Sequence, residues 1–441
     1  MERKKGKLTL WEAVAIAVGT MIGAGIFSIL GVGAQICGTN LPLAFVIAGL
    51  VAWFVAYSYA HLGRVYVSNA GPIEFIIRAF GDRLFVGVLA FLYWFSFVVS
   101  ISLFAKAFAY YGLALFHIPF NPLYVALVEA FVIAFFTVLN FFGAKAVGRV
   151  EFYIVLLKVA ILLSFVVLGI WTIKPELLKL DLTPAGLRDT LYAASILFLT
   201  YMGFGIITNA SEDMENPKRD VPRAIYLSLF IVMLVYVGVA LVAIGNLPVE
   251  QLIKAKEYAL AEAAKPFLGN LGFVLVSLGA LLSTSSAINA SLYGGANVAY
   301  VFARKGELPE FFERKVWFEA PEGLYITAIL ALLFALFFNL EGVASLISFA
   351  FIVIYQFVLL SHYRLADVVG GYRWVIVLGL VFVTTVGVIL LFYQYKVNKE
   401  VFYTAVVLIP LITLFEWFYK GKTQRRFKTR EETLKAESQK S

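Results

Sequence analysis

The chain has 441 residues, of which 61% are hydrophobic and 15% charged, and its formal net charge is +8. Ordinary globular domains are about half apolar and about a quarter charged, so this composition excludes a water-soluble globular protein and indicates a polytopic membrane protein. The single cysteine, Cys37, excludes a disulfide framework and a thiolate metal cluster. The histidines His61, His117 and His362 lie far apart without metal-ligand spacing, so no metal is expected.

The first predicted span covers about 10–35 and begins at the T-x-x-E capping box of Thr9–Glu12. No small-residue cleavage site follows a short apolar region, so we interpret it as a retained span and not as a signal peptide. Its centre, Gly19–Ser28, holds three glycines within seven residues, and each weakens a helix by about 1 kcal/mol relative to alanine. This pattern fits either an unwound backbone that lines a cavity or close packing of two spans.

Eleven further stretches are apolar enough to cross the hydrocarbon core, which takes about 20 helical residues. Most Lys and Arg residues fall in the tails and in the connections after even-numbered spans. This asymmetry predicts that both termini lie in the cytoplasm and that the number of spans is even, and it does not indicate nucleic-acid binding. The twelve predicted spans cover residues 10–35, 42–65, 84–112, 122–143, 150–173, 189–211, 222–246, 268–301, 323–339, 342–363, 373–394 and 400–419.

Two connections are predicted to carry short helices. After the turn signal Ser68–Pro72, the segment Ile73–Phe80 is typical of an amphipathic helix along the cytoplasmic membrane surface. On the opposite side, Pro248–Pro266 predicts a helical lid between spans 7 and 8. The C-terminal tail 421–441 is charged and has no apolar face, which indicates a mobile segment.

Span 6 is the second unusual span, because Gly203 and Gly205 lie near its centre and polar Thr208 and Asn209 follow within a turn. Spans 1 and 6 are five spans apart, so the second enters the membrane from the opposite side. Glycine-interrupted spans at matching points of two inverted halves are the best indication in a sequence of a secondary transporter's site. The pair favours unwinding over plain packing in span 1.

Three charged side chains, Lys158, Lys106 and Glu129, fall well inside predicted spans, away from the span ends where charges are common. Lys158 in span 5 lies about 12 Å deep at 1.5 Å per residue, where a charge costs about 2.5–3.5 kcal/mol. It therefore needs a partner, a cavity or loss of its proton, unless it reaches back to the headgroups. Lys106 and Glu129 lie at similar depth in spans 3 and 4 with opposite sign, which predicts a structural ion pair. The run Ser283–Ser286 in span 8 must point some hydroxyls at another span or a cavity.

Three motifs stand out: G-A-G-I-F at Gly23–Phe27, S-N-A-G-P at Ser68–Pro72, and E-N-P-K-R-D-V-P-R-A at Glu215–Ala224. They resemble the markers of the amino acid–polyamine–organocation (APC) superfamily in span 1, after span 2 and after span 6. The resemblance extends over nearly the whole chain, with weaker matches in spans 11 and 12. It is closest to archaeal proton-coupled amino-acid transporters.

The resemblance implies an all-α membrane protein of about twelve transmembrane helices with the five-plus-five inverted repeat of sodium-coupled leucine transporters. Such a protein is a multi-pass component of the plasma membrane. The implied parts are a cytoplasmic tail at 1–9, the first repeat at 10–173, the second, inverted repeat at 174–363, spans 11 and 12 at 364–420 and a cytoplasmic tail at 421–441.

The resemblance also implies a substrate site at the two broken spans. The freed amides of the break in span 1 would bind the substrate carboxylate, in agreement with the positive dipole end of a half-helix. The carbonyls of Ile22, Leu199 and Met202 would bind its ammonium group. The implied substrate site comprises Ile22, Gly23, Ala24, Gly25, Leu199, Met202 and Gly203.

In proton-coupled relatives a lysine in span 5 stands where sodium-coupled relatives bind a cation between spans 1 and 8, and Lys158 matches that position. Its amine would reach the carbonyl of Gly19 and the hydroxyl of Ser283. Protonated Lys158 would then brace span 1 against span 8, and loss of the proton would let them separate. The resemblance thus implies a proton as coupling ion and no cofactor.

Many members of the superfamily have an acidic residue where this chain has Gly205, so recognition of cationic substrates there is not implied. The main hypothesis is proton-coupled symport of neutral amino acids by alternating access. Alternatives are an amino-acid exchanger, or a polyamine or cationic amino-acid carrier, with Lys158 as a fixed charge, and a non-transporting amino-acid sensor. No nucleophile–base or metal-ligand set in the sequence indicates an enzyme.

Overall fold

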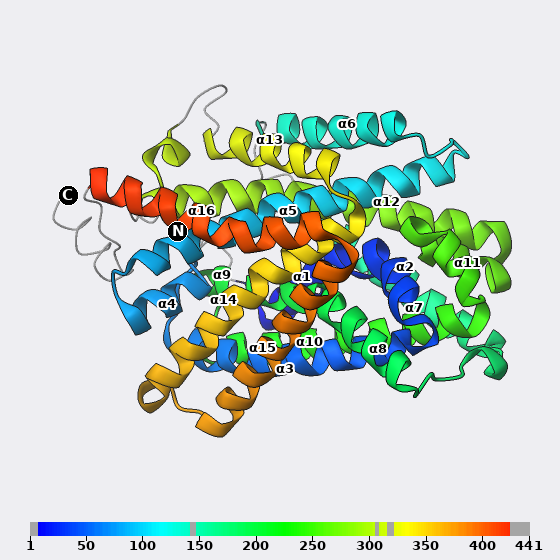
Figure 1. Ribbon diagram of the computed structural model, residues 1–441, viewed down its shortest axis with the longest axis horizontal. Helices are drawn as coiled ribbons and strands as arrows, with labels where there is room; N and C mark the ends of the chain where they lie inside the picture. Colours follow the sequence, from blue (N-terminus) through cyan, green and yellow to red (C-terminus); the bar gives the residue numbers. More distant parts are fainter. Residues whose placement is uncertain (1–7, 142–146, 305–307, 315–321, 424–441) are drawn as a thin grey trace, which may run out of the picture.

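The computed structural model describes residues 8–141, 147–304, 308–314 and 322–423, which form an elongated bundle of helices (Figure 1). Residues 1–7 and the predicted C-terminal tail beyond 423 lie outside the described residues. The α-helices are α1 Leu10–Ala24, α2 Ile26–Cys37, α3 Leu41–Val65, α4 Pro72–Phe80, α5 Leu84–Leu115, α6 Pro122–Phe141, α7 Val147–Gly169, α8 Pro184–Leu197, α9 Ile206–Asn209, α10 Pro217–Asn246, α11 Val249–Lys254, α12 Ala259–Arg304, α13 Glu322–Phe337, α14 Leu340–Val369, α15 Arg373–Val397 and α16 Lys399–Thr423. The 3-10 segments are η1 Gly38–Asn40, η3 Ile170–Thr172, η4 Pro175–Leu177, η5 Phe198–Gly205, η6 Ser211–Asp213, η7 Lys256–Tyr258 and η8 Glu310–Glu313.

The predicted spans coincide with these helices. Among the described residues, ten helical stretches are long and apolar enough to cross a membrane, and the shorter apolar helices Leu10–Gly23 and Glu322–Phe337 supply the first half of span 1 and span 9. The Thr9 capping box is present, because the Thr9 hydroxyl accepts from the Glu12 amide and the Glu12 carboxylate accepts from the Thr9 amide. The all-α polytopic fold is confirmed, and its division into two inverted repeats stays a prediction.

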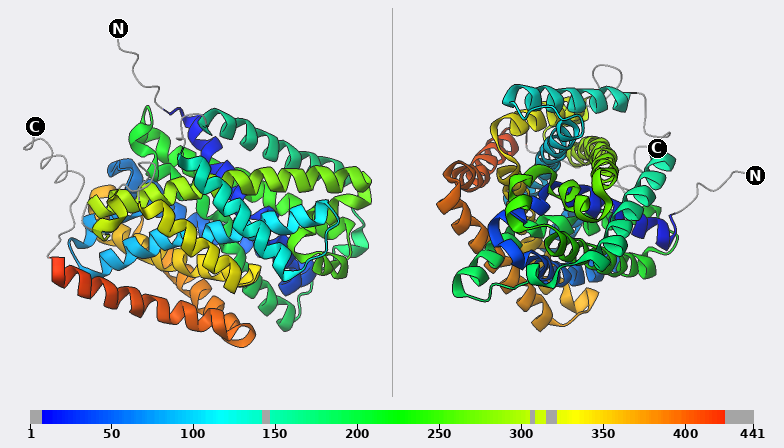
Figure 2. Two further views of the ribbon diagram at one scale, coloured as in Figure 1. Left: turned by 90° about the horizontal axis from the view of Figure 1, so that it is seen from above. Right: turned by 90° about the vertical axis from the view of Figure 1, so that its right-hand side faces the viewer.

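The helices differ in how much of their surface other helices cover. The most apolar stretches of α6, α7, α15 and α16 are only 22–33% buried, so their large exposed side chains are placed to face lipid. By contrast, α1 contacts α5, α7, α10 and α12, and nearly every residue of α2 is buried. In Figure 2 the dark blue ribbon of α2 lies inside the ring of surrounding helices. Span 1 is therefore the centre of the bundle.

Both described ends of the chain lie near the connection between α3 and α5, the first through Asp213 and the second directly. The amide of Leu8 donates to the Asp213 carbonyl at 2.7 Å, and the side chain of Asn69 in that connection donates to the Asp213 carboxylate at 3.3 Å. Lys420 near the end of α16 forms an ion pair with Asp82 in the same connection. The two ends therefore lie at one end of the bundle, as an even number of spans requires, and we call it the termini end.

The predicted amphipathic helix over Ile73–Phe80 forms as α4, but little of its surface is open to solvent. Its residues are buried apart from Arg78 and Phe80, because α5 and α14 pack against it. The buried Glu74 pairs with Arg78 at 2.9 Å. The helix is therefore confirmed, and its position along the membrane surface stays a prediction. The amphipathic pattern alone does not show that neighbouring helices cover most of α4.

The predicted lid between spans 7 and 8 consists of α11, η7 and the first turns of α12. It lies against α2 so closely that a methyl group on Gly31 would collide with the carbonyl oxygen of Lys256. The Lys256 Nζ lies 3.8 Å from one carboxylate oxygen of Glu341 on α14, and the Tyr393 hydroxyl donates to the other at 3.0 Å. The lid therefore covers α2 at the end of the bundle opposite the termini end.

Candidate functional site

Span 1 is broken at Gly25, which separates α1 from α2 with φ −117° and ψ −79°. The hydroxyl of Tyr236 on α10 donates to the Met21 carbonyl oxygen at 2.6 Å, in place of a helical amide. A Cβ on Gly25 would lie 2.6 Å from the Cβ of Thr200 in span 6, so only glycine permits this approach. The predicted interruption of span 1 is confirmed and is confined to one residue.

Span 6 is interrupted by η5, a 3-10 segment of eight residues from Phe198 to Gly205, whereas such segments rarely exceed three or four residues. Side chains from α14 hydrogen-bond to carbonyls in and before it. The Tyr355 hydroxyl donates to the Met202 carbonyl at 3.3 Å, and the Ser348 hydroxyl donates to the Ile196 carbonyl at 3.0 Å. The predicted interruption is confirmed as an overwound segment and not as an unwound one.

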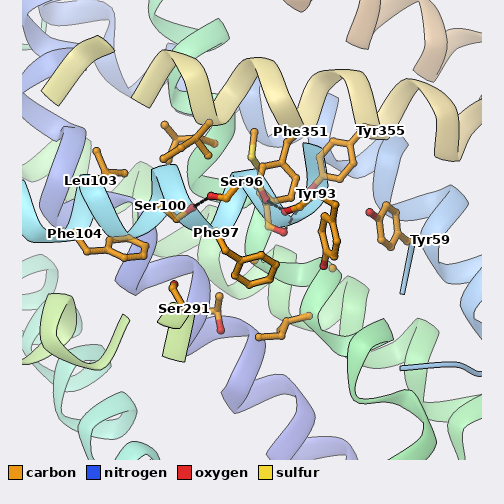
Figure 3. Close-up of a pocket in the computed structure, with 17 residues that line it drawn as sticks. Tyr59, Tyr93, Ser96, Phe97, Ser100, Leu103, Phe104, Ser291, Phe351 and Tyr355 are labelled. Carbon is orange, nitrogen blue, oxygen red and sulfur yellow. Dashed lines mark hydrogen bonds between the residues drawn. The ribbon is translucent and has the colours of Figure 1, made fainter. Parts of the chain in front are cut away.

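A cavity of about 100 Å³ lies beside the interruption of span 6, and Thr20 of α1 contributes to its lining. Figure 3 shows its main wall, where Tyr93, Ser96, Phe97, Ser100, Leu103 and Phe104 follow one another along α5 and face Phe351 and Tyr355 of α14. Of the predicted substrate residues, Leu199, Met202 and Gly203 line this cavity.

The other predicted substrate residues that the structure describes in full, Ile22, Gly23 and Gly25, do not line the cavity. Ile22 is fully buried, and of Ala24 the structure describes the backbone, which ends α1. A Cβ on Gly23 would point at α7 and α12, and a Cβ on Gly25 would point at Thr200. The binding roles of all these residues, Ala24 included, stay a prediction.

The described residues that line the cavity include no charged side chain. Its polar groups are hydroxyls, and several of their protons are used within the protein. Ser96 Oγ donates to the Tyr93 carbonyl at 2.6 Å, and Ser100 Oγ donates to the Ser96 carbonyl at 2.7 Å. The Asn209 amide donates to the Tyr93 hydroxyl at 3.0 Å. The cavity is therefore apolar with a few oriented dipoles, which suits a ligand whose variable part is neutral.

Lys158 lies where α7, α1 and α12 meet, and only 2% of its surface is exposed. A Cβ on Gly23 would lie 3.4 Å from Lys158 Nζ and 3.7 Å from the Ser283 carbonyl oxygen. The Ser283 hydroxyl is buried and has no hydrogen-bond partner among the described residues. Gly19, one turn earlier on α1, packs against Val155 of α7. The amine is thus beside both helices, and its predicted contacts with Gly19 and Ser283 stay a prediction.

The predicted ion pair of spans 3 and 4 is present. Lys106 Nζ lies 3.0 Å from Glu129 Oε1 between α5 and α6, and 6% and 1% of these residues are exposed. The pair lies outside the cavity lining. This position agrees with the predicted structural role.

Several residues of this region were not predicted from the sequence. Tyr236 and Tyr355 bond the carbonyls of the two interruptions, but a tyrosine in an apolar span looks like any other core residue. Ser96 and Ser100 are spaced four residues apart, which places two hydroxyls on one face of α5. That spacing is the one pattern that could have identified the cavity wall in advance.

The chain matches a family of known proteins over most of its length. The pattern of a family described as amino acid permease matches residues 8–415. The chain is 57% identical over 427 residues to an uncharacterized protein of Methanocaldococcus jannaschii, which covers 97% of this chain and 98% of that protein.

Two relatives have names that state a substrate. The chain is 28% identical over 452 residues to a methylthioribose transporter of Bacillus subtilis, covering 94% of this chain and 93% of the relative. It is 27% identical over 390 residues to the branched-chain amino acid permease BcaP of Lactococcus lactis, covering 81% of each chain.

Proposed function

The chain belongs to the amino acid permease family, and from this premise we propose that it is a proton-coupled symporter of neutral amino acids that works by alternating access. It carries its substrate across the plasma membrane with both termini in the cytoplasm. We infer the substrate class from the cavity beside the two interrupted spans. The described residues that line this cavity include no charged side chain. A cationic side chain would lose its hydration there without gaining a carboxylate.

The interrupted backbone supplies the groups for the common part of an amino acid. The substrate carboxylate is bound by amides at the start of α2, where the half-helix dipole is positive. Its ammonium group is bound by carbonyls that helical hydrogen bonds do not saturate, among them Leu199 and Met202. The Met202 carbonyl accepts from the Tyr355 hydroxyl, so this hydroxyl shares or yields that oxygen when substrate binds. The substrate side chain then extends along α5.

Lys158 links the proton to this site. Its amine lies beside Gly23 of α1, two residues before the interruption, and the Ser283 carbonyl of α12 lies beside the same glycine. A protonated amine has three donors and no acceptor, so it holds the two helices together through their oxygen atoms. Loss of the proton removes a donor and the charge, and α1 is then free to move away from α12.

The experiment is uptake by purified protein in liposomes, with a panel of amino acids and methylthioribose and with proton and sodium gradients imposed separately. We expect accumulation of neutral amino acids that follows the proton gradient and is indifferent to sodium. Lys158→Ala should lose accumulation while it still exchanges substrate across preloaded liposomes, because the site itself remains.

The matched control is the double variant Lys106→Met/Glu129→Leu, which also removes a buried lysine but outside the site. It should keep proton-driven accumulation. A Lys158→Ala protein that accumulates substrate in response to a pH gradient contradicts the role of Lys158. Wild-type protein that exchanges substrate but never accumulates it identifies an exchanger, and binding without any flux identifies a sensor.

A further inference from the structure

A second cavity lies at the termini end of the bundle, apart from the proposed transport site. It measures about 660 Å³, within the range of about 300–1,000 Å³ for small-molecule sites. It runs between α5, α14 and α16, which contact one another, with the end of α4 at its margin. In Figure 1 these helices meet at the end of the bundle that carries α4. None of its lining residues lines the cavity at the interrupted spans.

The groove is apolar along its length and basic at one end. Its charged lining residues are Arg83, just before α5, and Arg364, in the last turns of α14, and both are exposed. Within the described residues neither guanidinium forms an ion pair, and Arg364 lies 5.3 Å from the ring centre of Phe80. The hydroxyl of Thr413 donates to the Ile409 carbonyl at 2.7 Å, so its proton is already used.

Carboxylates near the groove do not neutralise the positive charge at its basic end. Asp82 is held in an ion pair by Lys420, which leaves the adjacent Arg83 outside that pair. Glu416 on α16 is 3% exposed and is not among the lining residues. The mouth of the groove therefore presents two guanidinium groups. Their planar donors fit the oxygen atoms of a phosphate or a carboxylate in a bidentate arrangement.

The depth of the groove matches one leaflet of a membrane. Along α14 it extends from Arg364 inward to Val353, which is about 16 Å at 1.5 Å per residue. The hydrocarbon core is about 30 Å thick, so the groove reaches from the headgroup level to about the midplane. Along that distance α5 contributes buried Val88, Leu89 and Leu92.

We propose that this groove binds one anionic phospholipid of the leaflet at the termini end. The phosphate lies between the guanidinium groups of Arg83 and Arg364, and a hydrocarbon chain lies along the wall formed by Val88, Val353 and Phe357. A free phosphate ion would pair with the arginines but would leave this apolar wall uncovered. The length of the apolar wall therefore favours a lipid. Basic pockets between transmembrane helices on one side of a membrane are typical of such headgroup sites.

The test counts lipid retained by the intact purified protein in native mass spectrometry, after incubation with micelles that contain phosphatidylglycerol and phosphatidylcholine in equal amounts. We expect one phosphatidylglycerol per chain, retained in preference to phosphatidylcholine. The double variant Arg83→Gln/Arg364→Gln should bind it roughly 30-fold more weakly, equivalent to about 2 kcal/mol at about 1 kcal/mol per basic side chain.

The matched control is Lys218→Gln/Arg223→Gln, which removes two exposed charges at the same end of the bundle outside the groove. It should retain phosphatidylglycerol like the wild type, and an equal loss overturns the site in favour of general attraction to basic residues. Val353→Trp fills the groove without changing charge and should reduce lipid retention. If that variant binds normally while millimolar inorganic phosphate displaces the lipid, the site takes free phosphate and the proposal is wrong.

Discussion

At Gly203 the two interrupted spans come closer than a side chain allows. A Cβ on this residue would lie 2.8 Å from the backbone nitrogen of Met21 and 2.8 Å from its Cγ. Gly205, two residues further along η5, would place its Cβ 3.5 Å from the Tyr59 ring, which is an ordinary contact. The requirement for glycine is therefore specific to the position that faces α1.

We predict that Gly203→Ala lowers the rate of substrate uptake in liposomes by about 100-fold, because the backbone of α1 must move by about 1 Å to make room. Gly205→Ala is the matched control and should keep uptake within about threefold of the wild type, since its Cβ meets only an ordinary contact with a ring. Equal losses in the two variants would show that helix propensity, and not the contact with Met21, requires the glycines.

The buried pair Lys106–Glu129 allows a second prediction at this scale. Removing one partner leaves an uncompensated charge and costs about 3–5 kcal/mol, whereas replacing both with apolar residues is often neutral. Lys106→Met and Glu129→Leu should each lower the unfolding midpoint in detergent, and the double variant should restore it. A double variant that is less stable than either single variant would contradict the structural role.

At the scale of elements, the lid of α11 and η7 depends on its contact with α2. The Lys256 carbonyl fills the space where Gly31 lacks a side chain, and the Lys256 side chain reaches Glu341 at the start of α14. The lid thus joins the second half of span 1 to span 10. Opening this end of the bundle requires these contacts to separate.

We predict that Gly31→Ala loosens the lid, since overpacking costs about 1–3 kcal/mol. Amide hydrogen exchange of residues 249–258 should become about tenfold faster or more. Gly33→Ala is the matched control on α2, because its Cβ meets only the methyl ends of Leu41 and Leu197, which can move. Unchanged exchange in Gly31→Ala would show that η7 is not held by this contact.

At the scale of the whole molecule, both described ends of the chain lie at the termini end. Lys and Arg gather in the segments that the span count assigns to this end, which is the arrangement of cytoplasmic segments. If this orientation holds, we expect the lid to face outward and the groove of Arg83 and Arg364 to face the inner leaflet.

We predict that protease sites added at both termini are cut in inside-out vesicles and protected in right-side-out vesicles. A cysteine at the exposed lid position Lys254, in a Cys37→Ser background, should react with an impermeant maleimide only in right-side-out vesicles. Cleavage of one terminus alone would contradict the even number of spans. Cleavage of both in right-side-out vesicles would reverse the orientation.

Local features of the sequence determined the spans and their interruptions. Helix length follows from apolar run length, the Thr9 cap forms within one turn, and Gly25 and Gly203 weaken their own helices wherever they are placed. Opposite charges at similar depth were also sufficient to predict the ion pair of Lys106 and Glu129, because an unpaired charge in lipid is costly.

Only the tertiary structure decided which groups meet across the bundle. The Tyr236 hydroxyl reaches Met21 from 215 residues away, and His61 and His362, far apart in the chain, stack with ring centres 5.2 Å apart. The same holds for α4, which neighbouring spans cover on both faces. An apolar helix has many residues that could face a neighbour, and its periodicity does not say which neighbour that is. The packing of the helices decides which faces meet, and the cavity and the groove lie where those faces leave space between them.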